Sequence, residues 1–437
     1  MGVFIFIGLL YHIMLHLSFF RQQPELAAQR LALRNLDGTA LVNQVLALDT
    51  HHRQALAQFE AEKAALNLNS KQIGEAMRSG QAESAQALKA ESTLLKEKVA
   101  ALEKQVTQAE EALQQLLISI PNAPQLSVPA GTSAEHNLVV RSGGPSPEQM
   151  KAQIPHWDVA DRLQLIDFAL GVKITGAGFP VYKGPGARLQ RALIQYFLDF
   201  NTDAGYTEFQ VPHLVNADSG FGTGQLPDKE GQMYHVGEDD LYLIPTAEVP
   251  LTNIFRDVIL PEASLPVKMT GYTPCFRREA GSYGKDVRGL NRLHQFDKVE
   301  IVQVTTPEQS DAALEDMVRH VEKLVASLGL SYRILKLCGG DMGFASSLTY
   351  DFEVWSSAQK RWLEISSVSN FEGFQANRLK LRYKGKEGKP SPLATLNGSA
   401  LALPRVLAAI LEQYQDEQGI LVPEVLQPYT RFQRLDW

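Results

Sequence analysis

The amino-acid sequence predicts an α+β fold, in which an antiparallel β-sheet is flanked by helices and preceded by an N-terminal antiparallel helical hairpin. Two observations predict this fold. Between residues 41 and 120, apolar residues recur at seven-residue spacing along two long stretches, which is typical of two helices paired through a narrow seam. From about residue 139 onward, strand patterns follow one another without the regular strand–helix alternation of a parallel sheet. The 437 residues are enough for two or three domains.

The first thirteen residues contain a nearly continuous apolar run. This run is shorter than the ~20 residues that a membrane-spanning helix needs. No basic residue precedes it and no small-residue cleavage site follows it, so the pattern of a secretory signal is not met. We expect that Met14 is the natural start and that residues 1–13 are an over-extended start or an unassigned segment, with a membrane anchor as the alternative. Directly afterwards, the alternation of Leu15, Leu17 and Phe19 predicts a short strand.

The helical hairpin is predicted over residues 41–118, and Ser79 and Gly80 suit the turn between its arms. Each arm of ~40 residues would be ~60 Å long. The seam is defined by Leu41, Val45, Leu48, Ala55, Phe59, Leu66 and Ile73, and then by Leu88, Leu95, Val99, Leu102, Val106, Ala109, Leu113, Leu116 and Ile120. Prolines after residue 120 end the second arm. We therefore expect one domain at 14–125 and a second at 126–437.

The second domain combines helix and strand patterns. Its predicted helices are Pro185–Ala204, Pro307–Leu328 and Pro404–Gln415. Its predicted strands are Thr207–Val211, Leu241–Ile244, Val267–Phe276, Leu293–Val304, Tyr350–Trp355 and Trp362–Ser366. Several strands in succession, followed by helices, favour an antiparallel sheet covered on one side.

Composition excludes several classes of protein. With 42 basic and 49 acidic residues, the net charge of −7 gives no global positive field for nucleic acid, so any RNA contact must come from a local patch or from shape. The hairpin itself carries ten acidic and eight basic residues. The two cysteines, Cys275 and Cys338, are far apart in sequence, which disfavours a disulfide framework and a cysteine-based zinc site and favours the cytoplasm. The sequence has no phosphate-binding P-loop and no GxGxxG after a strand.

The chemistry-bearing residues gather in a strand–loop–strand segment. Two-residue periodicity places Arg277 and Glu279 on one face of the first strand. On the second strand it places five side chains on one face: Arg292, His294, Phe296, Lys298 and Glu300. Arginine suits a phosphate, phenylalanine can stack on a purine, and a carboxylate can hold an ammonium or a hydroxyl group. The alternative is a charged sheet face with ordinary cross-strand pairs. The glycines at 281, 284 and 289, around a basic loop, favour the binding site.

This segment, residues 276–300, resembles motif 2 of the class II aminoacyl-tRNA synthetases in the form found in the seryl-tRNA synthetase family. Three further blocks agree in order and spacing. Residues 184–212 resemble motif 1, a long helix that leads into a strand ending at a proline. Residues 243–248 resemble the serine-binding TxE loop, and residues 397–405 resemble motif 3. The hairpin fits the family too, so the resemblance covers nearly the whole chain.

The resemblance implies roles for individual residues. Arg277 and Arg405 would be the catalytic arginines at the α- and γ-phosphates of ATP. Serine would be bound by Thr246, Ala247, Glu248, Glu300 and Ser399. ATP would be bound by Arg277, Arg278, Glu279, Leu293, Phe296, Glu364, Ile365, Ser366, Ser367 and Arg405. Glu364 and Ser367 would hold Mg²⁺. Because these two residues are three positions apart, either the strand is irregular there or one contact is indirect.

The resemblance also implies an activity: ATP-dependent conversion of L-serine to seryl-adenylate, followed by transfer to tRNA(Ser), with tRNA(Sec) as a further substrate. It implies a homodimer, because the motif 1 helix of this class packs at a dimer interface. We expect Mg²⁺ but no zinc, a cytoplasmic location and no association with a membrane. Two alternatives remain: a paralogue that loads an amino acid onto a carrier protein, and a non-catalytic coiled-coil scaffold that binds RNA.

Overall fold

The computed structural model describes residues 17–150, 153–228, 230–279, 288–385 and 388–437. The chain divides into two compact units, one made of residues 17–32 and 36–121, the other of residues 33–35 and 122–437. Among the described residues, none of the helices combines the length and apolar character needed to cross a membrane.

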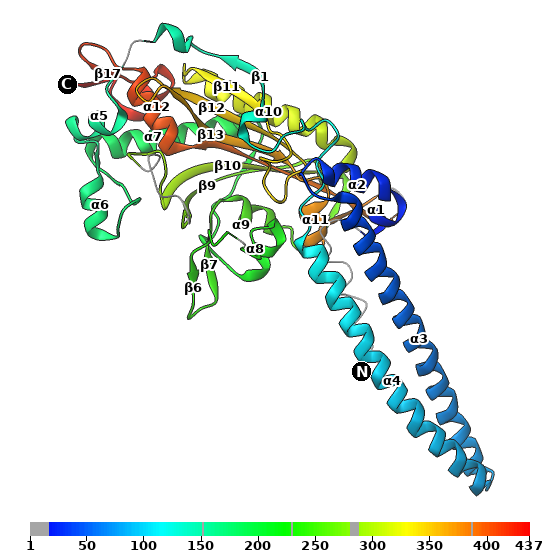
Figure 1. The fold of residues 1–437 in the computed structure, drawn as a ribbon. Helices are drawn as coiled ribbons and strands as arrows, with labels where there is room; N and C mark the ends of the chain where they lie inside the picture. The colour runs from blue at the N-terminus through cyan, green and yellow to red at the C-terminus, as the bar shows by residue number, and fades with distance from the viewer. Residues whose placement is uncertain (1–16, 151–152, 229, 280–287, 386–387) are drawn as a thin grey trace. The chain divides into compact units, whose positions relative to one another are not determined.

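The first unit is helical. Its elements are α1 (Leu17–Gln22), α2 (Pro24–Ala32), α3 (Gly38–Arg78) and α4 (Ala82–Ser119). α3 and α4 lie side by side as an antiparallel hairpin (Figure 1), which confirms the predicted arm. Asp37 caps α3, since its carboxylate accepts a hydrogen bond of 2.9 Å from the Ala40 amide. Gly80, with φ at +72°, forms the turn after α3.

The seam of the hairpin is partly polar. Asp49, His52 and Asn69 of α3 are buried there together with the apolar positions. The carboxylate of Asp49 is held by both ends of the Arg21 guanidinium, at 2.5 and 2.9 Å, which fixes α1 to α3. The Asn69 amide donates to the Glu91 carboxylate of α4 at 3.0 Å, so the register of the two arms is set partly by polar contacts.

The predicted strand after residue 13 is wrong. Its last residues form helix α1 instead, and residues 14–16 lie outside the described part of the chain. Leu17 and Phe20, three positions apart, are both buried, which is helical spacing. Alternation over so few residues fits either period, and packing against the rest of the helical unit decides in favour of the helix.

The second unit is built on an eight-stranded sheet with the order β1-β11-β12-β13-β16-β10-β9-β4. The strands are β1 (Leu138–Gly143), β4 (Thr207–Glu208), β9 (Val267–Phe276), β10 (Gln295–Thr305), β11 (Tyr332–Lys336), β12 (Leu348–Ser356), β13 (Arg361–Asn370) and β16 (Ala394–Ala402). All neighbours are antiparallel except β4, which pairs with β9 in parallel. The predicted antiparallel sheet is therefore confirmed.

Three long helices pack on one face of this sheet (Figure 1): α7 (Gly184–Asp203), α10 (Ser310–Ser327) and α12 (Leu403–Gln413). The remaining helices are α5 (His156–Arg162), α6 (Phe168–Ile174), α8 (Ala217–Thr223), α9 (Glu248–Asn253), α11 (Phe374–Arg378) and α13 (Gln427–Thr430). The short strands are β2 (Ile166–Asp167), β3 (Val181–Tyr182), β5 (Leu214–Val215), β6 (His235–Val236), β7 (Leu241–Leu243), β8 (Ile259–Pro261), β14 (Arg382–Lys384), β15 (Pro390–Pro392), β17 (Gly419–Leu421) and β18 (Arg434–Asp436).

Alternation along β10 decides which side chains face the helices. Val299 and Ile301 are fully buried in the large apolar core between the sheet and the three long helices. Val302 belongs to a second cluster, on the other face, with Ala247 and Leu251. The side chain of Glu300 therefore points away from the main core. This face of the sheet carries the candidate site.

Arg34 anchors the loop between β11 and β12. Its guanidinium donates to four backbone carbonyls, those of Asn122, Met342, Gly343 and Ser346, at 2.6–3.0 Å. Burial lowers the pKa of Arg34 to about 10. The side chain of Asn122 donates to two more carbonyls, of Ala345 and Phe371. These contacts fix a loop that has no regular secondary structure of its own.

We expect Arg34→Met to lower the free energy of unfolding by about 2–4 kcal/mol, because four backbone carbonyls, three of them in partly buried contacts, lose their donor. Thermal or urea unfolding of the full chain measures the loss. The matched control is Arg319→Met in α10, whose exposed ion pair with Asp316 should contribute less than about 1 kcal/mol. Equal losses in the two variants would contradict the role of Arg34.

Candidate active site

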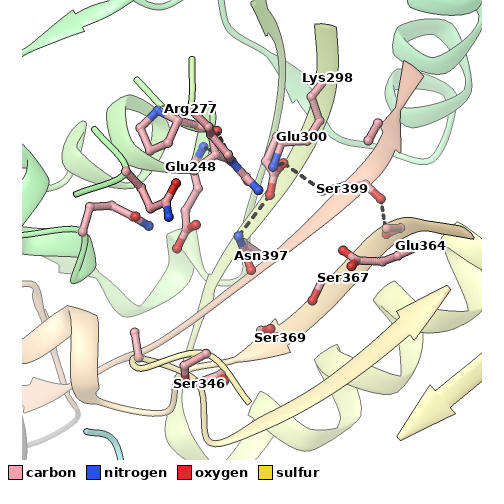
Figure 2. Close-up of a pocket in the computed structure, with 18 of the residues that line it drawn as sticks. Glu248, Arg277, Lys298, Glu300, Ser346, Glu364, Ser367, Ser369, Asn397 and Ser399 are labelled. Carbon is pink, nitrogen blue, oxygen red and sulfur yellow. Dashed lines mark hydrogen bonds and ion pairs between the residues drawn. The ribbon is translucent and has the colours of Figure 1, made fainter. Parts of the chain in front are cut away.

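A cavity of about 700 Å³ opens on the face of the sheet opposite the long helices (Figure 2). Of the fifteen residues to which the resemblance assigns roles, thirteen line it: Thr246, Glu248, Arg277, Glu279, Leu293, Phe296, Glu300, Glu364, Ile365, Ser366, Ser367, Ser399 and Arg405. Two do not. Ala247 is fully buried next to Glu248, and Arg278 is exposed. The predicted basic loop spans residues 282–291, and its residues 282–287 lie outside the described part of the chain.

The carboxylate of Glu300 lines the cavity, and Glu300 is fully buried. Glu300 lies opposite Ser399 in the pairing of β10 with β16. One of its oxygens accepts from the Asn397 amide at 3.0 Å, and the other from the Ser399 hydroxyl at 3.3 Å and the Lys298 ammonium at 2.7 Å. Figure 2 shows this group of side chains converging from the two strands. Such a carboxylate is an acceptor for an ammonium or hydroxyl group that enters the cavity.

A second buried carboxylate, Glu248, begins α9. It accepts a hydrogen bond of 2.6 Å from the Gln375 side chain, whose own oxygen accepts from the Thr395 hydroxyl at 2.8 Å. Burial, and then the negative charge of Glu300, raise the pKa of Glu248 to about 7. The two carboxylates therefore differ: one is paired with a cation and the other is held by a neutral amide.

Arg277 and Glu279 reach the cavity although they lie beyond the end of β9. The amide of Arg277 donates to the carbonyl of His294 at 2.9 Å, which continues the pairing past the strand. The guanidinium of Arg277 lies 5.3 Å from the centre of the Phe296 ring. Glu279 adopts a left-handed backbone conformation, with φ at +48°, and its carboxylate pairs with Arg292.

The predicted common face of residues 292–300 is only partly correct, because β10 begins at Gln295. Arg292 still lines the cavity, but His294 does not. The ring of His294 stacks on Phe179 and lies within hydrogen-bonding distance of the Tyr234 hydroxyl, 3.1 Å. Strict alternation fails before the strand begins, since those residues follow the path of the preceding loop.

Glu364 and Ser367 both face the cavity because β13 is irregular. Phe352 of β12 pairs with Ser366, and its neighbour Glu353 pairs with Glu364, so Ile365 is an extra residue in β13. This β-bulge brings residues three positions apart to the same face. Of the two explanations that the three-residue spacing allowed, an irregular strand or an indirect contact, the structure has the irregular strand.

Asp351 extends this group, and sequence reasoning missed it. It lies directly opposite Ser367 in the β12–β13 pairing and lines the cavity. Its Oδ1 is buried without a hydrogen-bond partner. Burial, and then the charge of Glu364, raise the pKa of Asp351 well above its usual value. Carboxylate and hydroxyl oxygens are ligands that Mg²⁺ prefers, and an unpartnered buried oxygen beside them fits a cation. These residues are therefore compatible with the predicted Mg²⁺.

Arg405 lies near the start of α12. Its Nε donates to the Asn291 carbonyl at 2.9 Å, and one Nη donates to the Glu364 carbonyl at 2.8 Å. Pro404 precedes it in the first turn of the helix, where the missing amide hydrogen costs nothing. A second cation thus faces the cavity close to the Glu364–Ser367 segment.

Three other side chains hold the two buried carboxylates, and these contacts were missed by sequence reasoning, although it placed Lys298 on the same strand face as Glu300. Asn397 and Gln375 position the two buried carboxylates, and Lys298 pairs with one of them. Asn397 lies inside the motif 3 block, which is a signal that could have found it. Gln375 is remote in sequence from Glu248, and nothing in its neighbourhood indicates the contact.

Comparison with known proteins identifies the class first. Residues 233–414 match the family model described as tRNA synthetase class II core domain (G, H, P, S and T). Residues 14–124 match that of the seryl-tRNA synthetase N-terminal domain. The serine--tRNA ligase of Salinibacter ruber is 47% identical over 97% of this chain and 99% of its own, and that of Methylacidiphilum infernorum is 46% identical over 96% and 99%.

Solved structures agree. The seryl-tRNA synthetase of Pyrococcus horikoshii complexed with ATP has a TM-score of 0.90 at 33% identity, covering 97% of this chain and 99% of its own. The cytoplasmic serine-tRNA ligase of Naegleria fowleri in complex with AMP has a TM-score of 0.86 at 28% identity, covering 98% and 99%. The chain belongs to the seryl-tRNA synthetase family. The predicted family, fold class and class of enzyme are thereby confirmed.

The pKa of Glu248 gives a prediction about stability. Because this pKa, about 7, lies above the value of an unfolded chain, the folded state binds more protons in between, and stability falls as pH rises through 7. Glu248→Gln removes this dependence. We therefore expect the variant to be relatively more stable at high pH. The difference in free energy of unfolding, variant minus unchanged protein, should be higher at pH 8.5 than at pH 5 by up to about 3 kcal/mol.

Unfolding of the unchanged protein and of Glu248→Gln is measured at both pH values. Any pH-independent effect of the substitution on the free energy of unfolding cancels when the two pH values are compared. Exposed Glu238→Gln is the matched control and should show no such difference. A Glu248→Gln variant that is destabilised equally at both pH values would contradict the assignment.

Proposed function

We propose that this protein activates L-serine with ATP, forming seryl-adenylate and pyrophosphate, and then transfers the seryl group to tRNA(Ser). The observation that carries the proposal is the cavity itself, which is lined by two buried carboxylates, Glu248 and Glu300, and by two arginines, Arg277 and Arg405, in a chain of this family. Carboxylates suit the ammonium and hydroxyl groups of serine, and guanidinium groups suit the phosphates of ATP.

At the amino-acid end, Thr246, Ala247, Glu248, Glu300 and Ser399 would form the serine site. Glu300 and Ser399 are hydrogen-bonded to each other and would share the serine hydroxyl. Ala247 would contribute through its backbone, because it lies fully buried between Thr246 and Glu248. A site built to bond a hydroxyl group rejects alanine strongly, by about 10⁴–10⁵, because its buried polar groups would be left unpaired.

At the nucleotide end, Arg277 and Arg405 would bind the phosphates, and Leu293 and Phe296 would hold the adenine. The remaining proposed ATP contacts are Arg278, Glu279, Glu364, Ile365, Ser366 and Ser367. Glu364 and Ser367 would also bind Mg²⁺, with no zinc involved. When bound, Mg²⁺ would neutralise phosphate oxygens.

In the first step, the serine carboxylate attacks the α-phosphorus, an O–P bond forms, and pyrophosphate leaves. Arg277 and Arg405 stabilise the charge that grows on the phosphoryl oxygens and keep the reactants aligned. In the second step, a ribose hydroxyl at the 3′ end of the tRNA attacks the acyl carbon. Its proton passes to the phosphate of the adenylate, which leaves as AMP.

The hairpin of α3 and α4 would bind the tRNA, with tRNA(Sec) as a second substrate. Its near balance of acidic and basic residues suits recognition of backbone shape rather than attraction by a large positive field. The two alternatives, a carrier-protein ligase and a non-catalytic scaffold, fit less well. A carrier-protein ligase would not need a tRNA-binding arm. A non-catalytic scaffold would not need the binding side chains Arg277, Glu300 and Arg405.

We also propose a homodimer in the cytoplasm. Apolar side chains of β1, the strand at one end of the sheet order, support a partner subunit: Leu138, Val139 and Val140 are each more than 40% exposed. Cys275 and Cys338 are free and buried, which suits a reducing compartment.

The test of the activity is ATP–pyrophosphate exchange with each of the twenty amino acids. We expect exchange with serine alone. Glu300→Gln should raise the KM for serine at least about 100-fold, because the neutral amide cannot balance an ammonium and orients differently. The KM for ATP should stay within about twofold. Exchange that is strongest with another amino acid, or an unchanged KM for serine in the variant, would contradict the proposal.

The test of the arm is deletion of residues 41–118, with the ends rejoined by a short Gly–Ser linker. We expect serine-dependent exchange to stay within about threefold of the full chain and tRNA charging to fall by more than about 100-fold, since the lost contacts bind only the tRNA. Both rates are measured on the same preparations. Charging at the normal rate would show that the arm does not bind the tRNA.

A further inference from the structure

The ammonium group of Lys298 lies 2.7 Å from one carboxylate oxygen of Glu300. Their side chains are only 7% and 0% exposed. Because the residues are two positions apart on β10, both point to the cavity face (Figure 2). Burying a lysine ammonium costs desolvation free energy, which its ion pair with Glu300 must offset. A lysine in this position therefore suggests a functional role.

The partners of Glu300 are arranged so that each holds it from a different side. Lys298 and Ser399 contact one oxygen, and Asn397 contacts the other. This leaves the plane of the carboxylate little freedom to rotate. A serine that enters the cavity meets an acceptor whose direction is already set, which lowers the entropy lost on binding.

The charges at this end of the cavity also balance. The charged and titratable groups that face Glu300 are Glu248 from α9, Cys275 from β9, Arg277 beyond β9 and Lys298 on its own strand. Two carboxylates thus stand against two cations, and zwitterionic serine adds no net charge. Without Lys298, two buried carboxylates would share one cation, and one of them would take up a proton.

Resting on the proposed function, we propose that Lys298 is a positioning residue for serine recognition, which holds the Glu300 carboxylate in its binding direction and balances its negative charge. Lys298 acts through Glu300 and need not touch serine. Gln375 holds Glu248 by a neutral bond, so the cation is placed at one carboxylate only. The ion pair with Lys298 therefore distinguishes Glu300 from Glu248.

The experiment uses serine-dependent ATP–pyrophosphate exchange over pH 6–9. For Lys298→Met we expect a KM for serine raised about 10- to 100-fold and a KM for ATP within about twofold. Loss of the cation favours protonation of Glu300, so the acid limb of kcat/KM for serine should move to higher pH by about one unit. Lys298→Arg keeps the charge and should keep the acid limb in place.

The matched control is Arg333→Met, which removes an ion pair with Glu353 from the same sheet. It should change neither the KM for serine nor the pH profile. The double variant Lys298→Met/Glu300→Gln carries no unbalanced charge of this pair, so it tests the idea even if Lys298→Met does not fold. Because Lys298 acts through Glu300, the double variant should bind serine no worse than Glu300→Gln alone.

The inference is overturned if Lys298→Met matches Arg333→Met, if its acid limb does not move, or if the double variant is tenfold worse than Glu300→Gln. A failure of the proposed function is a different result, since the unchanged protein would then show no serine-dependent exchange at all.

Discussion

Burial of two carboxylates, Glu248 and Glu300, in one cavity is the constraint that the surrounding structure satisfies. Each would be expensive to desolvate as an unpaired charge, and their mutual repulsion adds to the cost. The sheet meets this constraint by pairing β10 with β16, which brings Asn397 and Ser399 to Glu300. Glu248 is supported by a neutral side-chain amide. The result is a pair of acceptors with different partners, a lysine ammonium for Glu300 and a neutral amide for Glu248.

The other charged groups of the cavity depend on departures from regular structure. Arg277 lies beyond the end of β9, Arg405 lies in the first turn of a helix, and Glu364 and Ser367 share a face only through a β-bulge. A regular strand would separate such groups onto two faces. Strand ends and bulges let several functional groups converge on a ligand while the middle of each strand stays in the apolar core.

These departures explain how much the sequence could predict. Seven-residue spacing was sufficient for the hairpin, and β9 was predicted with its observed bounds, because long periodic segments carry a strong signal. The family resemblance led to thirteen of the cavity-lining residues. Asp351 and Gln375 could not be found in this way, since their roles arise from contacts across strands or between distant segments. α1 was mistaken for a strand because the apolar pattern of so short a segment fits the period of a strand as well as that of a helix.

Within the proposed function, the same cavity predicts unequal selectivity against the two amino acids most similar to serine. Alanine lacks the hydroxyl group, so it would leave the buried polar groups around Glu300 and Ser399 unpaired, at high cost. Threonine keeps the hydroxyl and adds a methyl group, which only the shape of the cavity can oppose, and a methyl group is worth only about 1–3 kcal/mol. Rigid placement of Glu300 therefore matters for both. It keeps the polar groups where alanine cannot satisfy them, and it prevents the relaxation that would make room for threonine.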